Sequence, residues 1–168
     1  AIAGTAAATA VGTMVAKSVS SFADYEQLTG GVDTLFKDSS AAVQKYANDA
    51  YKTAGLSANN YMETVTNFSA SLISSLKGDT AKAADYANSA LVDMADNANK
   101  MGTNMTDIQN AYQGFAKQNY TMLDNLKLGY GGTQAEMKRL LGDAQKLTGQ
   151  KYDISSFADI TQAIHAIQ

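Results

Sequence analysis

The chain has no proline among its 168 residues, and proline is the residue that most strongly interrupts a helix. Alanine, the best helix former, is abundant instead. Apolar residues recur at three-, four- and seven-residue steps, and no useful stretch alternates at period two. These features predict an all-α fold: six or seven amphipathic helices, capped by glycine and arranged as helical hairpins or an irregular bundle.

Helix start and stop signals divide the chain. The run Leu28-Thr29-Gly30-Gly31 interrupts the first helical pattern, so we expect a Gly/Ala-rich N-terminal helix over residues 1–29 and a helical hairpin domain over 30–168. Within that domain, polar residues predict helix N-caps at Ser39 or Ser40, Ser57, Asp79 or Thr80, Thr133 and Ser156. Thr106 precedes one further helical pattern. Thr133 and Glu136 have the spacing of a capping box. Four glycines are placed to end helices: Gly55, Gly78, Gly102 and Gly149.

The composition excludes several classes of site. The absence of cysteine rules out disulfides, thiolate metal sites and cysteine nucleophiles. The single histidine, His165, leaves no pair of imidazoles for a metal. A net charge of −3 with one arginine, Arg139, argues against a specific nucleic-acid site. We therefore expect no catalytic residues, no metal and no cofactor.

A stripe of small residues marks the first helix. Gly4, Ala8, Gly12 and Ala16 recur at every fourth position, which lets another helix backbone approach closely. The weakly apolar stretch 1–16 is shorter than the ~20 residues that span a bilayer. Because the chain begins at Ala1 rather than methionine, we expect it to be a segment of a longer protein. The stripe leaves open an alternative function, interaction with a membrane.

Three further groups of residues have both a functional and a structural interpretation. The run Gly129-Tyr130-Gly131-Gly132-Thr133 could bind phosphate, but it lacks the lysine of a phosphate loop, and a tight turn leading into the Thr133 cap is favoured. Asp93 and Asp96 share a helix face that could hold a hard cation, although a solvated face is favoured. His165 is interpreted as a surface or boundary residue.

Tyrosines fall on the apolar faces of several predicted helices, at positions 46, 51, 61 and 112. A tyrosine ring can pack in a core while its hydroxyl reaches a polar edge, which suits helix–helix contacts. We therefore expect these four side chains to contribute to packing.

Longer stretches resemble tail tape measure proteins of long-tailed bacteriophages and prophages, notably those of Gram-positive hosts. The strongest stretches are AYQGFAKQNYTMLDNLKLGYGGT at 111–133 and EMKRLL at 136–141. LTGGVDTLF at 28–36, GLSANNYM at 55–62, DMADNANKMGT at 93–103, KYDI at 151–154 and AIHAIQ at 163–168 are similar to the same family, so the resemblance covers residues 22–168. The family-like motif comprises Tyr112, Gly114, Phe115, Asn119, Asp124, Asn125, Gly129, Tyr130, Gly131, Gly132, Glu136 and Arg139.

The resemblance implies a structural role in the virion. Tape measure proteins lie in several copies inside the tail tube, set tail length during assembly and leave the tail ahead of the DNA. It implies self-association, contacts with tail tube protein, tail assembly chaperones and baseplate or distal tail proteins, and a location in the tail lumen after assembly in the host cytoplasm. It supplies no catalytic residues for these positions. The alternatives are a channel-forming segment that acts on the host membrane and, least favoured, a muralytic enzyme.

Overall fold

A computed structural model describes residues 4–168 of the protein, with side chains described from residue 20 onward. All regular structure in this part of the chain is helical, with no strand, so the all-α prediction is confirmed. The seven α-helices and two 3-10 helices are α1 (Gly4–Phe36), η1 (Lys37–Ser39), α2 (Ser40–Thr53), α3 (Ala58–Ser75), α4 (Thr80–Met101), α5 (Met105–Ala116), η2 (Leu123–Leu126), α6 (Gln134–Thr148) and α7 (Phe157–Ile167).

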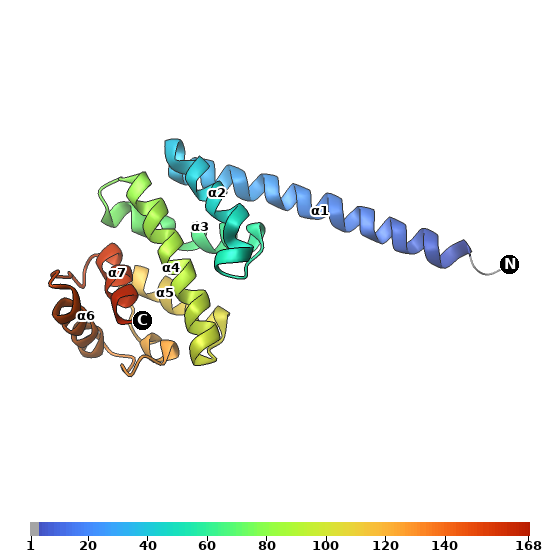
Figure 1. Ribbon diagram of the computed structural model, residues 1–168. Coiled ribbons are helices and arrows are strands. Elements are labelled where there is room, and N and C mark those ends of the chain that lie inside the picture. The colour runs from blue at the N-terminus through green and yellow to red at the C-terminus, as the bar shows by residue number, and fades with distance from the viewer. Residues whose placement is uncertain (1–3) are drawn as a thin grey trace.

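Helix α1 is a rod that extends well beyond the rest of the molecule (Figure 1). Its C-terminal part packs against α2 and α3, while the N-terminal part continues away from them. Helix α4 lies at the centre of the helical body and contacts α2 and α3 on one side and α7 on the other. Helices α6 and α7 pack against each other at the end of the body remote from α1.

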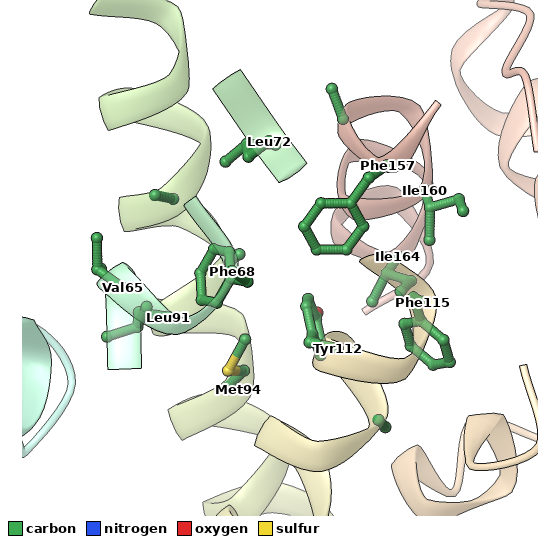
Figure 2. Close-up of a cluster of buried hydrophobic side chains, with 14 of the residues drawn as sticks. Val65, Phe68, Leu72, Leu91, Met94, Tyr112, Phe115, Phe157, Ile160 and Ile164 are labelled. Atoms are coloured by element: carbon green, nitrogen blue, oxygen red, sulfur yellow. The ribbon is translucent and has the colours of Figure 1, made fainter. Parts of the chain in front are cut away.

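The core forms where α3, α4, α5 and α7 meet (Figure 2). Phe68 of α3 contacts Phe157 of α7 edge-on, with ring centroids 6.0 Å apart. Leu91 and Met94 of α4 are fully buried beside them, as is Tyr112 of α5. Residues far apart in the chain therefore share one apolar cluster, and this cluster fixes α7 against the body.

Four of the predicted N-caps are present as hydrogen bonds, whereas Ser39, at the start of α2, makes no side-chain capping bond. The side chains of Ser57, Asp79, Thr133 and Ser156 each accept from the backbone N–H three residues further on. Gly102 and Gly149 end their helices in the left-handed conformation. The start of α5 differs from the pattern based on Thr106, since Asn104 is its N-cap and accepts from the N–H groups of Thr106 and Asp107.

The prediction that the first helix ends at residue 29 is wrong, because α1 continues through Gly30 and Gly31 to Phe36. Each glycine in a helix costs about 1 kcal/mol relative to alanine. Beyond the glycines, however, Val32 and Phe36 are fully buried in the core. Burying two such side chains contributes about 3–6 kcal/mol, which exceeds the cost of the glycines.

Tyr51, which the sequence places on an apolar face, is exposed, as are the large apolar side chains of Phe22 and Leu147. In α2 the buried positions are Val43, Ala47 and Ala50. Tyr51 follows Ala50 and is therefore turned about 100° away from that stripe. Its side chain is 80% exposed, so the expectation that Tyr51 packs in the core is wrong.

Candidate functional site

The first half of the family-like motif builds the end of α5 and the turn after it. Tyr112 and Phe115 are core residues, with ring centroids 5.8 Å apart. The carbonyl of Gly114 accepts from the backbone N–H of Asn119, and a Cβ on Gly114 would lie 3.0 Å from the Asn119 carbonyl oxygen. The Asn119 side chain in turn accepts from the backbone and hydroxyl of Thr121. These residues reverse the chain direction tightly after α5.

The loop before α6 requires a glycine at position 132, where it packs against the segment that follows the turn after α5. A Cβ added there would lie 2.9 Å from the carbonyl carbon of Thr121 and closer still to its oxygen. Ordinary carbon–carbon contacts are 3.5–4.0 Å. The loop before α6 thus packs backbone against backbone on the segment after α5. Asp124 and Asn125 lie between them in η2, where the carbonyl of Asp124 accepts from the N–H of Lys127.

The second half of the motif is a compact group of charges at the start of α6. Arg139 donates to both carboxylate oxygens of Glu136, at 3.0 and 2.6 Å, and to the carbonyl of Gly129 at 2.7 Å. Its guanidinium lies 4.2 Å from the centre of the Tyr130 ring. Glu136 also accepts from the backbone N–H of Gly131 at 3.0 Å. The hydrogen bonds from Arg139 and then from Gly131 lower the pKa of Glu136 from 4.5 to about 2.

These contacts decide between the two interpretations of the glycine run. A phosphate would be held by loop amides at the N-terminus of a helix. Here the Gly131 amide is occupied by the carboxylate of Glu136, whose charge is matched by Arg139. The Thr133 side chain meanwhile accepts from the N–H of Glu136. The loop is therefore a turn leading into the α6 cap, with its anion supplied by the chain itself.

A second polar arrangement joins α4 to α7. Nδ1 of His165 lies 3.0 Å from both carboxylate oxygens of Asp93. The interpretation of this aspartate as part of a solvated face is wrong, since α7 covers Asp93 and leaves it 7% exposed. Burial raises the pKa of Asp93, and the imidazole partly opposes this rise. His165 itself is a boundary residue, as expected, with 56% of its side chain exposed.

The pair borders a groove of about 470 Å³. The groove is lined by Asp93, Asp96, Asn97, Lys100, Met101, Lys127, Leu128, His165, Ile167 and Gln168. Several of its polar groups have hydrogen-bonding or ionic partners within the fold. Asn97 donates to the Leu126 carbonyl and accepts from Thr103, while Lys100 lies 3.6 Å from Asp96. The 72-residue separation of Asp93 and His165 left no local pattern by which the sequence could reveal this pair.

The predicted stripe of small residues lies within α1, at Gly4, Ala8, Gly12 and Ala16. Its side chains and their packing lie outside the described residues. Within the described part of the chain, no three His, Cys, Asp or Glu side chains gather closely enough to hold a metal ion. No helix there combines the length and apolarity needed to cross a membrane.

Comparisons with known proteins found no match among family models, curated proteins or solved structures.

Proposed function

We propose that this chain is a structural segment of a phage tail tape measure protein, which sets tail length and templates polymerisation of the tail tube. One observation carries the proposal beyond the resemblance of residues 22–168. Helix α1 is continuous over 33 residues and extends the chain along one axis from the helical body. At 1.5 Å per residue it covers about 50 Å. A rod joined to a body of fixed size gives the segment a defined length.

The family-like motif supports the proposal because its residues maintain shape. Gly114 and Gly132 allow close backbone packing, and Glu136 with Arg139 fixes the loop before α6. Such groups need no substrate and no cofactor to do this. In the proposed role the segment acts by occupying length and by presenting helix faces to its neighbours.

The proposed role includes the partners and location of a tape measure protein. Several copies would associate inside the tail tube, in contact with tube protein and with baseplate or distal tail proteins. Tail assembly chaperones would bind the chain in the host cytoplasm before the tail closes around it. The exposed face of α1 around Phe22 is available for such contacts.

Tail length tests the proposal directly. In the whole protein, the 168-residue segment is deleted in frame in one phage and duplicated in another. If the segment lies fully extended as helix, each change shifts the tail by about 250 Å in opposite directions. If the body stays folded, the shift is smaller but keeps its sign. Tails are measured by electron microscopy of negatively stained particles.

Tyr51→Ser is the matched control, since Tyr51 is exposed and the substitution leaves chain length unchanged. Tails of this variant should equal those of the wild type. Tails of wild-type length in both the deletion and the duplication would overturn the ruler role of this segment.

A further inference from the structure

Two clefts that meet at Gln118 have no charged side chain in their walls. The first lies between α3, the end of α5 and the start of α7, and the second between the turn after α5 and the loop before α6. Their volumes are about 400 and 460 Å³. Because Gln118 lines both, the clefts adjoin, and we call them together the uncharged surface. The groove beside Asp93, by contrast, is lined by two aspartates and two lysines.

The first cleft combines hydroxyl and amide groups with an aromatic floor. Ser71 and Ser74 are three residues apart on α3, so both lie on the same side of that helix. Gln118 contributes an exposed amide from the turn after α5. Phe115 and Phe157 also line the cleft, but only 1% and 4% of their surface is exposed, so the rings form its floor (Figure 2). The hydrogen-bonding groups therefore stand above apolar rings.

In the second cleft, the fold leaves particular polar atoms for a ligand. Oδ1 of Asn119 accepts from the backbone N–H and the hydroxyl of Thr121, so its NH2 group remains to donate. Oγ1 of Thr133 accepts from the N–H of Glu136 at 3.2 Å, so the Thr133 O–H remains to donate. Gln134 is exposed, and its side-chain amide has no partner in the described part of the chain.

These groups indicate the chemical class of a ligand. An anionic ligand is bound best by lysine or arginine, and neither lines the two clefts in the described structure. The N-terminus of α6 already holds an anion of the chain, because Glu136 accepts from the Gly131 amide. An apolar ligand would leave the amides and hydroxyls of both clefts without partners, which is costly. A neutral ligand with many hydroxyls can donate to and accept from all of them.

A peptide is also neutral and polar, but the surface lacks what peptide recognition uses. Peptides dock on an exposed sheet edge or in a groove with accessible apolar or aromatic pockets. The described part of the chain has no strand, and the rings of Phe115 and Phe157 are nearly buried. Each cleft has a volume in the range of about 300–1,000 Å³ that is typical of ligand sites. Two adjoining sites suit a chain of repeated units.

We propose that the uncharged surface is a binding site for a neutral oligosaccharide. Sugar units in the second cleft accept hydrogen bonds from Asn119 and Thr133 and exchange them with Gln134. Gln118 bonds to the chain of sugars where it passes between the clefts, and the serines of α3 bond to the units in the first cleft. The site performs no chemistry on the sugar, and it is independent of the proposed role in tail length.

Titration of the intact, isotope-labelled chain followed by NMR tests the site. The probes are three neutral tetrasaccharides: maltotetraose, cellotetraose and chitotetraose. The NH2 signals of Gln118, Asn119 and Gln134 report directly on the groups that are proposed to bind. We expect at least one probe to shift them in a saturable way, with a dissociation constant of about 1 mM or below. Signals of Lys127 and of other residues of the groove beside Asp93 should stay in place.

One substitution removes a binding group without harming the fold. Gln118 has a φ of 58°, in the left-handed region that favours glycine, so Gln118→Gly should keep or raise Tm. It should weaken sugar binding by about fivefold or more, since it deletes the amide that both clefts share. Lys127→Gly is the matched control, because Lys127 has a φ of 52° and lies outside the uncharged surface. This control should bind the sugar like the wild type.

Several outcomes would overturn the proposal. These are the absence of saturable shifts with all three sugars, and equal affinity of the wild type and Gln118→Gly. Binding that weakens strongly as salt is raised would also do so, because a neutral ligand carries no charge to screen. Tighter binding of a peptide of serine, asparagine and glycine than of every sugar would assign the surface to a polypeptide instead.

Discussion

Substituting Gly132 with alanine tests the interpretation that the family-like motif shapes the backbone. The added methyl carbon would lie 2.9 Å from the carbonyl carbon of Thr121 and 3.3 Å from its Cα. Since carbon–carbon contacts settle near 3.5–4.0 Å, the two segments must separate by roughly 0.5–1 Å or more. The Thr121 segment cannot yield freely, because the adjacent Tyr120 is nearly buried and its hydroxyl donates to the Ile154 carbonyl at 3.0 Å.

Such overpacking typically costs about 1–3 kcal/mol, and the anchored backbone places Gly132→Ala near the upper end of that range. For a chain of this size each kcal/mol shifts Tm by about 2–4 °C, so Tm should fall by roughly 6–12 °C. The assay is thermal unfolding followed by circular dichroism, with urea unfolding at 25 °C as a check.

Gly142→Ala is the matched control, because it adds the same methyl group to the interior of α6 with nothing within 4 Å. It should raise stability by about 1 kcal/mol through helix propensity alone. If Gly132→Ala left Tm unchanged while Gly142→Ala raised it, the reasoning from backbone contact would be refuted.

Two further predictions concern a buried hydroxyl and a low pKa. The Tyr112 hydroxyl is buried with no hydrogen-bonding partner in the described structure, so Tyr112→Phe should raise the free energy of unfolding by about 1 kcal/mol in urea. Tyr61→Phe is its control and should lose about as much, because the Tyr61 hydroxyl donates to Asn88 at 3.0 Å; the reverse order would contradict this. The pKa of Glu136 is lowered to about 2, so its charge stabilises the fold above pH 4.5 and this contribution disappears as the pH falls toward 2. The difference in Tm between wild type and Glu136→Gln should therefore shrink from pH 6 to pH 2, and a constant difference would count against the prediction.

Helix starts could be predicted from the sequence because capping is local chemistry. The side chains of Ser57, Asp79 and Thr133 each bond to a backbone N–H only three residues away. The same locality explains the error at Gly30 and Gly31. Their cost to the helix is visible in the sequence, whereas the burial of Val32 and Phe36 that offsets it depends on α2 and α3.

In the candidate site, too, local features could be predicted from the sequence and contacts between distant segments could not. The capping box of Thr133 and Glu136 was predictable, but the Glu136 carboxylate bonds to the Gly131 amide rather than to its usual target at the N-cap. The need for glycine at position 132 depends on Thr121, eleven positions earlier. Nothing near Asp93 indicated that a histidine from the last helix would cover it. Each of these features arises from tertiary packing.

The continuity of α1 fixes direction as well as length. Val32 and Phe36 anchor one end of the helix in the core, so they set the rotational phase of the whole rod. Each residue turns a helix by about 100°, so one residue inserted just upstream of Val32 would swing everything before it by that angle. An insertion of seven residues would return the rod to within about 20° of its original phase. Whatever meets the far end of α1 is therefore oriented by two side chains in the body, and only insertions of nearly whole turns preserve that alignment.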